Sequence, residues 1–474
     1  MSVTEREIVV ETEEARQTPK KGLRRELSSF AVLLLTLSSL SPVVSVFGMG
    51  GDVLHQAGAA AAGLFGFAIL AAVVWAVVYA ELGSAYPYAG GDYVGVGRIL
   101  GSWAGVVTLA IWAVTAGPSL AFAAQTLTIY VGQLAPQIPA PAVTFVGLLG
   151  ALAVALMSVR RGALITGLFL AVESVAIAVL IAVGAGRPVR GVGAILIHPV
   201  AVGAGGSLAP VAFSVIALAA VSTVYATVGG NQALFFGEEL KDPHRRMGPV
   251  VIMACMGGAF ATALPIIFVV LSAPDLGALL RSPAPFAQFL SARLGAWAGP
   301  ALSAGVAVAI FNANIVQLMG SARLYFSLGR DGLFPMPVNR LLSRVDPHSG
   351  TPRSATLVVA VFAGACCFLP AHTLLVFMTG LLVYGWSLVC LALLIGRLKG
   401  LTGAPGYWRA PLFPLAPVVG LVMAVGFTLA DLADKDAGRP SLLLLGLVVV
   451  AALVWNQFGL RRRGWTPQLG ESEG

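Results

Sequence analysis

Residues 29–55 have the sequence SFAVLLLTLSSLSPVVSVFGMGGDVLH, which is the most informative segment for predicting the fold. It is long enough to cross a bilayer core of roughly 30 Å, but Ser38, Ser39, Ser41 and Pro42 interrupt it halfway. Proline lacks a backbone donor and clashes with the preceding helical turn. Broken backbone at membrane depth is tolerated only where it is buried in protein or lines a cavity. The stretch therefore predicts a discontinuous transmembrane helix.

The rest of the chain extends this pattern into an all-α polytopic membrane protein. Of 474 residues, 58% are apolar and only 11% are charged, against roughly 25% charged in an ordinary soluble domain. This composition excludes a soluble or nucleic-acid-binding protein and makes the lipid bilayer the solvent. We predict twelve spans, at residues 29–55, 59–83, 102–133, 139–158, 162–185, 210–237, 247–273, 299–328, 354–369, 373–396, 412–431 and 441–459.

The basic residues predict the orientation. With the N-terminus in the cytoplasm, 23 Lys and Arg residues fall on the cytoplasmic side and 6 on the other. Such a bias follows the positive-inside rule. We therefore expect both termini to be cytoplasmic, in a multi-pass protein of the plasma membrane, with residues 187–208 and 431–440 outside. Residues 1–28 are rich in charged residues, so we predict that they form a cytoplasmic N-terminal tail and contain no cleavable signal peptide. We predict that residues 460–474 form a cytoplasmic C-terminal tail.

A second break is predicted in the sixth span, where residues 222–232 read STVYATVGGNQ. Paired glycines disfavour helix by about 1 kcal/mol each. Breaks in spans one and six are expected of two inverted five-helix repeats, although a packing kink is the alternative for each. Exposed helix ends would direct N–H groups and carbonyls into one cavity. That arrangement suits a solute with both a carboxylate and an ammonium group.

Three further segments resemble motifs of the amino acid–polyamine–organocation (APC) superfamily. They are AELGSAYP at 80–87 with GGDY at 90–93, GEELKDPHRR at 237–246, and SAR at 321–323 with GRDGLFP at 329–335. The resemblance implies an amino acid permease with the LeuT-type fold, in which two five-helix repeats (29–185 and 210–396) form a ten-helix core over 29–396. Two additional helices would occupy 397–459, and transport would proceed by alternating access.

The resemblance also implies a substrate site. The family's glycine-rich stretch in span one, which offers N–H groups to a substrate carboxylate, falls on Val43–Phe47, where Ser45 is the small polar residue. The contact would be made there or shift to Ser41 and Ser45. In span six the unwound centre falls on Thr227–Gly230, and Tyr225 matches the aromatic residue that closes over the substrate. The expected substrate-binding residues are Ser41, Val43, Val44, Ser45, Tyr225, Thr227, Val228, Gly229 and Gly230.

Polar residues inside the spans add candidates. Glu173 lies about 16 Å along its helix from Gly162, near the midplane, where a carboxylate is costly and suggests function. It is either a proton-coupling site or a hydrogen-bonded structural residue. Gln125, Asn231, Asn312 and Asn314 are expected to line the cavity or to bond between helices. Four acidic residues lie on the predicted cytoplasmic rim, namely Glu81, Glu238, Glu239 and Asp331. They either form a gating network with nearby arginines or are loop charges exposed to solvent.

The sequence contains no His, Asp, Glu or Cys cluster at one depth in the membrane, so we expect no enzyme, catalytic residue, metal or cofactor. The four cysteines lie in apolar segments, so we predict that they are buried and pack as small apolar residues. We predict a secondary transporter of an amino acid or a related amine-containing solute, with H⁺ as a possible coupling ion. A solute exchanger and a transporter-like sensor are the alternatives. The absence of charged residues near either break in the chain favours a neutral amino acid.

Overall fold

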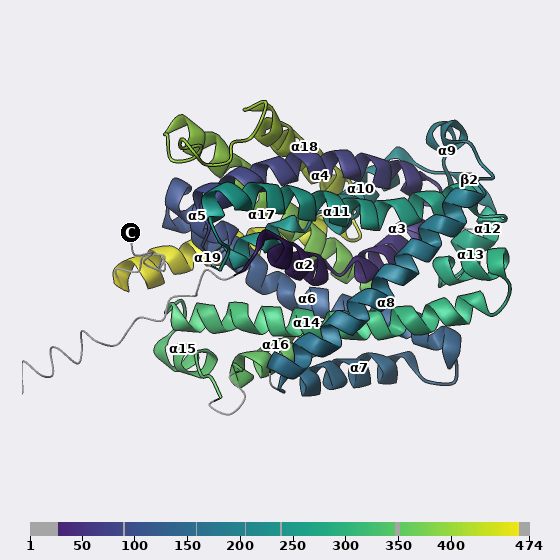
Figure 1. Ribbon diagram of the computed structural model, residues 1–474, viewed down its shortest axis with the longest axis horizontal. Helices are drawn as coiled ribbons and strands as arrows, with labels where there is room; N and C mark the ends of the chain where they lie inside the picture. The colour runs from purple at the N-terminus through teal and green to yellow at the C-terminus, as the bar shows by residue number, and fades with distance from the viewer. Residues whose placement is uncertain are drawn as a thin grey trace, which may run out of the picture.

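The computed structural model describes residues 27–88, 91–157, 159–203, 205–237, 239–346 and 351–463. In this part of the chain every regular element is a helix, apart from one hairpin of strands β1 (Val200–Val202) and β2 (Leu208–Pro210). The long helices run side by side along the longest axis of the molecule (Figure 1).

Eight helices among the described residues are long and apolar enough to cross a membrane. They are α4 (Ala60–Ala85), α6 (Ser102–Leu134), α10 with η2 (Phe213–Phe236), α11 (Pro243–Ser272), α14 (Ala298–Arg330), α17 (Ala371–Leu398), α18 (Leu415–Ala433) and α19 with η3 (Gly438–Leu460). Shorter apolar helices are α7 (Ala140–Ala155), α16 (Arg353–Cys366) and the part Ala171–Gly186 of α8 (Val159–Gly186). The all-α polytopic class is thus confirmed, whereas the count of twelve spans stays a prediction.

Short helices connect these segments at the two ends of the bundle. They are α5 (Asp92–Leu100), α9 (Val192–Ile197), α12 (Leu276–Arg281), α13 (Pro285–Leu294), α15 (Met336–Leu342) and η4 (Arg461–Arg463). Figure 1 shows α5 and α15 at one end, and α9, β2, α12 and α13 at the other. We call these the inner end and the outer end, after the predicted orientation.

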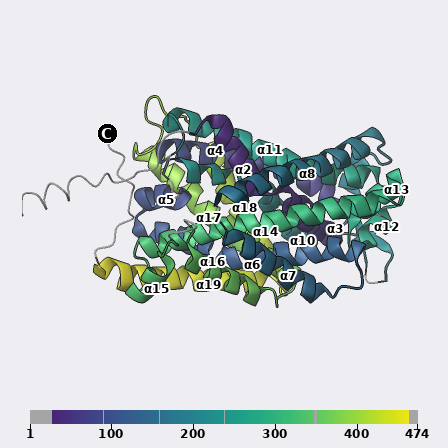
Figure 2. The same cartoon turned by 60° about the horizontal axis from the view of Figure 1, so that its bottom comes forward.

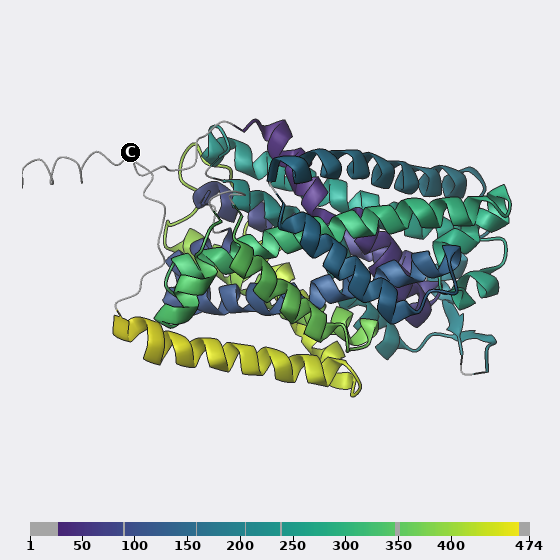
Figure 3. The ribbon, with the colours of Figure 1, turned by 90° about the horizontal axis from the view of Figure 1, so that it is seen from below.

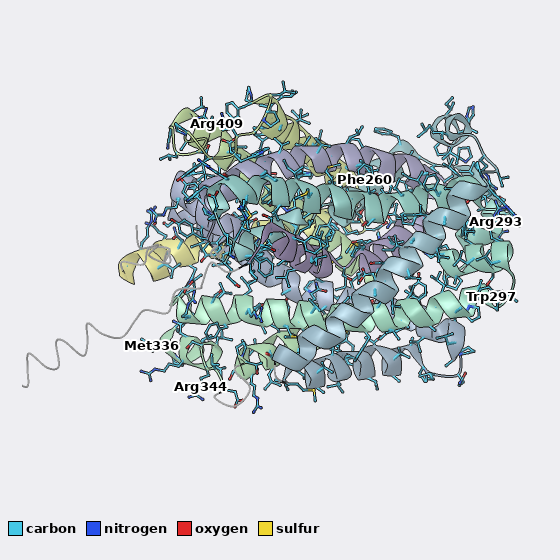
Figure 4. All side chains as sticks on the ribbon, viewed as in Figure 1. Phe260, Arg293, Trp297, Met336, Arg344 and Arg409 are labelled. Carbon is cyan, nitrogen blue, oxygen red and sulfur yellow. The ribbon has the colours of Figure 1, made fainter. Side chains whose placement is uncertain are left out.

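The labelled arginines separate in the same way. Figure 4 places Arg344 and Arg409 toward the inner end and Arg293 at the outer end. The predicted spans put the first two on the cytoplasmic side and the third on the opposite side. The fold therefore places these three arginines on the ends of the bundle that the sequence predicts.

The predicted first span is broken into three pieces. Helix α2 (Ser29–Leu40) stops at Ser41, whose φ of 44° is left-handed, and a π-helical segment η1 (Val44–Gly50) leads into α3 (Gly51–Ala57). A left-handed conformation costs a non-glycine residue roughly 1–2 kcal/mol. Pro42 follows and has no N–H to continue the helical bonding. The predicted break is confirmed, and the change of helix type beyond it was not foreseen.

The predicted sixth span is also broken. Helix α10 (Phe213–Thr227) ends at Val228, which is extended with φ −108° and ψ 127°. The chain continues through Gly229 into a 3₁₀ segment η2 (Gly230–Phe236). The two paired glycines therefore mark the place where the helix stops, as the sequence predicts.

The packing around the two broken spans forms the core. Helix α11 lies along α4 (Figure 1), and both contact α10. Helices α7, α14 and α16 contact one another and come forward together in Figure 2. Helix α19 runs along the edge of the bundle in Figure 3, the view from below. The broken segments are thereby enclosed by continuous helices.

Candidate substrate site

The two breaks lie against each other in the bundle. Segment η1 contacts α10, and α2 contacts η2, so each half of the first span meets the sixth. Val43, Val44 and Ser45 are buried, as are Thr227, Val228 and Gly230, while Tyr225 is half-buried. The structure therefore brings together the predicted substrate-binding residues of spans one and six.

Glu173 reaches the break of the first span. The backbone N–H of Val43 donates to Glu173 Oε1 at 2.7 Å, and the glutamate side chain is 5% exposed. The residue lies on α8, 130 positions away in the chain. The break thus releases a backbone donor, and a buried carboxylate accepts it.

This contact corrects one step of the sequence analysis. The preference for a neutral solute rested on the absence of charged residues near either break in the chain. The tertiary structure places the Glu173 carboxylate at the first break. The absence of a nearby carboxylate therefore no longer argues against a solute with a cationic side chain.

The second break is packed tightly around its glycines. A Cβ atom on Gly229 would lie 1.8 Å from Leu40 Cδ2, the end of a side chain on α2. A Cβ atom on Gly230 would lie 2.6 Å from the backbone nitrogen of Cys255 on α11. The Thr227 hydroxyl donates to Val224 O at 2.9 Å. The two glycines are needed for close approach, one to a side chain and the other to a backbone.

Tyr225 belongs to an aromatic stack at the second break. Its ring is nearly parallel to that of Trp386 on α17, at 6.2 Å between centroids. Trp386 in turn contacts Trp75 on α4 at 5.2 Å. The stack determines where Tyr225 stands next to the break.

Three of the other predicted polar residues have defined positions. Gln125 Nε2 donates to the carbonyls of Cys367 and Leu369 at 2.9 and 2.8 Å. Asn312 and Asn314 are buried on α14, which contacts α2 and η1. Their Oδ1 atoms, like Ser41 Oγ, have no hydrogen-bond partner among the described residues. The side chain of Asn231 lies outside the described residues.

A cavity of about 530 Å³ lies on the outer side of the first break. Its wall includes Phe47, Gly48 and Gly51 of the first span, together with residues of α6, α7 and the turn between α16 and α17. Among the described residues, none of α10 or η2 lines it. The cavity therefore adjoins the first break without including the second.

Two histidines and a carboxylate stand next to this cavity. Asp52 Oδ2 lies 3.1 Å from His372 Nδ1 and also accepts a hydrogen bond from Gln56. His55 Nε2 donates to Ser282 O at 2.8 Å. The sequence shows no cluster here, because His372 lies 320 residues from Asp52. No local sequence signal could have paired them.

At the inner end, Glu81 is fully buried among donors. Arg397 Nε donates to its Oε1 at 2.7 Å, and the other side of the guanidinium donates to Oε2. The Thr402 hydroxyl and the Ala410 N–H complete the set at 3.0 and 2.7 Å. This network ties α4 to α17 and to the 399–414 segment. Of the other three rim residues, Glu238 lies outside the described residues.

A second contact holds the same segment in place. The N–H of Trp408 donates to Ser84 Oγ at 2.9 Å, and His244 Nδ1 donates to the Ser84 carbonyl at 2.7 Å. The His244 ring stacks on Tyr407 at 4.1 Å between centroids. The 399–414 segment is therefore fastened to the ends of both α4 and α11.

The described residues contain no group of three or more His, Cys, Asp or Glu side chains that could hold a metal ion. Ionisable groups appear instead as isolated pairs, such as Glu81–Arg397 and Asp52–His372.

Comparison with known proteins places these features in a family. One similar protein, cationic amino acid transporter 9, chloroplastic, from Arabidopsis thaliana, is 25% identical over 361 residues, which cover 70% of this chain and 59% of that protein. This chain thus matches well under two thirds of the length of its relative. Residues 27–453 match the family described as amino acid permease. With that match across nearly all of its helices, the chain belongs to the amino acid permease family of the APC superfamily.

Proposed function

We propose that this protein is a secondary transporter that moves an amino acid across a membrane by alternating access. The observation that carries the proposal is the meeting of two broken spans next to Glu173. Helix interruptions at membrane depth serve as ion- and solute-binding points in transporters, because free N–H groups and carbonyls converge there. Family membership supports the same class of function and argues against an enzyme.

The substrate site is proposed to lie between the breaks. The N–H of Val43, next to η1, would receive the carboxylate of the solute once Glu173 releases it, and unpaired acceptors on Ser41 and Asn314 would receive its ammonium group. Tyr225 would cover the solute from the outer path before the inner path opens. The relative from Arabidopsis is named a cationic amino acid transporter, so cationic as well as neutral amino acids are candidates.

Glu173 is proposed to couple transport to protons. An ionised carboxylate is a stronger acceptor than a protonated one, so protonation would weaken the bond from Val43. The freed N–H would then be available to the carboxylate of the solute. Two carboxylates in one buried site repel each other, and a proton on Glu173 removes that repulsion. Proton binding and solute binding would thereby favour each other.

Uptake into proteoliposomes tests both parts. A panel of labelled neutral, cationic and acidic amino acids should identify the solute, with pH and sodium gradients imposed separately. Glu173→Gln should abolish accumulation driven by a pH gradient while leaving solute exchange largely intact. Unchanged accumulation in this variant would make Glu173 structural. Exchange without any net uptake in the parent would favour the exchanger alternative, and binding without either would favour a sensor.

The orientation is proposed from the charge distribution. A single cysteine in place of Lys435, in the turn between α18 and α19, should react with an impermeant thiol reagent from outside intact cells. Strong labelling only from the cytoplasmic side would reverse the assignment of inner and outer ends.

A further inference from the structure

The cavity at the outer end has walls that accept hydrogen bonds. Its three threonines, Thr126, Thr128 and Thr144, each donate their hydroxyl hydrogen to a carbonyl of their own helix. A hydroxyl that donates in this way still has lone pairs to accept a hydrogen bond. Gln125 uses its amide nitrogen on two carbonyls, which leaves its oxygen as an acceptor. A ligand that fits these groups must be a donor.

The formal charge of the wall is negative. Asp52 is the carboxylate among the described lining residues, and neither lysine nor arginine is among them. The Asp52 side chain is 20% exposed, so its charge is only partly screened by solvent. Its neighbours are Gln56 and His372, and His55 donates elsewhere, to Ser282 O. The carboxylate therefore has no permanently cationic partner among these contacts.

Aromatic rings supply the apolar part of the wall. Phe47, Phe122, Phe145 and Phe368 all line the cavity. The face of an aromatic ring attracts a cation, by roughly 0.5–2 kcal/mol depending on solvent exposure. Rings around a carboxylate form a site for a cation that also carries apolar groups.

We propose that this cavity is a binding site for an organic ammonium ion, with Asp52 as the counter-ion and the phenylalanine rings around its alkyl part. Its volume of about 530 Å³ accommodates a small amine or the ammonium group and side chain of an amino acid. The site is separate from the one between the breaks, because none of the described side chains of span six contributes to its wall. It does not depend on the transport activity proposed above.

His372 and Gln56 regulate access to the carboxylate. Gln56 Nε2 lies 2.9 Å from His372 Nδ1 and donates to Asp52 as well. A protonated imidazole would pair with Asp52 and compete with the ammonium ligand. A neutral imidazole leaves the negative charge to the cavity. Asp434 is a further charged group that acts on His372 from the turn after α18.

The chain contains its own reporter, because Cys367 lines the cavity. The experiment uses the full-length protein with Cys255, Cys366 and Cys390 replaced by alanine. The rate of modification of Cys367 is measured from pH 6 to pH 9 with two small methanethiosulfonates, because a protonated His372, 3.1 Å from Asp52, would occupy the carboxylate at the lower end of this range. One carries an ammonium group and the other a sulfonate, and both rates are normalised to those of a free thiol.

The cationic reagent should react at least several-fold faster than the anionic one, after normalisation. Asp52→Asn should remove most of this preference, whereas Asp52→Glu should preserve it. Asp436→Asn is the matched control, since Asp436 is an exposed carboxylate outside the cavity and its loss should change little. Propylammonium chloride should protect Cys367, and propanol at the same concentration should not.

Equal reactivity toward both reagents would overturn the proposal, as would a preference that survives in Asp52→Asn. Failure of both reagents to modify Cys367 in native protein, with normal reaction after denaturation, would show a cavity closed to solutes and would also overturn it. His372→Gln separates the charge effect from misfolding, because it keeps Asp52 and should retain or increase the preference for the cation. None of these outcomes requires transport, so they stand apart from the proteoliposome tests.

Discussion

Glu81 at the inner end and Asp52 at the outer end are both acidic residues on helices that meet α17, but their surroundings differ. Glu81 is fully buried and accepts from a guanidinium, a hydroxyl and a backbone N–H. Asp52 is partly exposed, has a histidine and a glutamine as neighbours, and borders a cavity. One carboxylate has its hydrogen-bonding capacity filled by the protein, whereas the other keeps capacity for a ligand.

The comparison shows how to separate structural from functional carboxylates in a membrane protein. Burying an ion pair is costly, and it is tolerated when further hydrogen bonds satisfy the remaining lone pairs. Glu81 meets this condition, so its network fastens the 399–414 segment to the bundle. Asp52 and Glu173 do not, because each accepts few hydrogen bonds next to a cavity or a break. Incomplete satisfaction is therefore the feature that points to function here.

The largest effect is expected from Glu81→Ala. Removal of the carboxylate leaves Arg397 partly buried and the Ala410 N–H without an acceptor, at a cost of about 3–5 kcal/mol. The folded fraction after heating in detergent, followed by fluorescence-detected gel filtration, measures the loss. Glu81→Gln, which keeps the shape, should fall between this variant and the parent. If Glu81→Ala is as stable as the parent, Glu81 is not a structural residue and does not differ from Asp52 in this respect.

The second largest effect separates the two glycines of the broken sixth span. Gly230→Ala places a methyl group against the backbone of Cys255 and should cost about 1–3 kcal/mol. Gly229→Ala meets the mobile end of Leu40 and should cost less in the same thermal assay. Equal losses in the two variants would contradict this packing.

Gly229→Leu extends the test from stability to binding. A leucine side chain at this position would collide with Leu40 and displace α2 from the break, so binding should be lost while the protein still inserts and folds in detergent. Parent-like affinity in correctly folded Gly229→Leu would refute a substrate site at this break.

A smaller effect is expected at Asp434, an outer carboxylate that caps a helix. It accepts from the N–H groups of Ala437 and Gly438 at the start of α19, and Asp434→Ala should cost about 1 kcal/mol at pH 7. Partial burial raises the pKa of Asp434, but the backbone N–H bonds outweigh it and hold the pKa below its usual range. A lowered pKa gives stability that is present above the unfolded value of about 3.9 and is lost as the pH falls. Melting curves of parent and variant should therefore begin to converge as the pH falls below about 4.

The smallest effect on stability is expected from Asp52→Asn. Its partner His372 is 38% exposed on the side chain, and an exposed pair contributes roughly 0–1 kcal/mol. The variant should melt close to the parent while losing the cation preference at Cys367. A stability loss as large as that of Glu81→Ala would make Asp52 a structural residue.

The membrane class, the two helix breaks and the family motifs could all be predicted from the sequence. Each depends on signals local to the chain: apolar runs of membrane length, a proline among serines, and paired glycines. Local steric and solvation rules act on neighbouring residues, so a single sequence displays them. The break at Ser41–Val43 and the one at Val228–Gly229 were predictable for that reason.

The pairs of polar groups that meet in the bundle could not be predicted from the sequence. Val43 and Glu173 are 130 residues apart, Glu81 and Arg397 are 316 apart, and Asp52 and His372 are 320 apart. Their pairing depends on how α8 and α17 pack against the broken first span and α4, which no short-range pattern encodes. The cavity and its acceptor-rich wall follow from the same packing, because a cavity is what side chains from several helices leave unfilled.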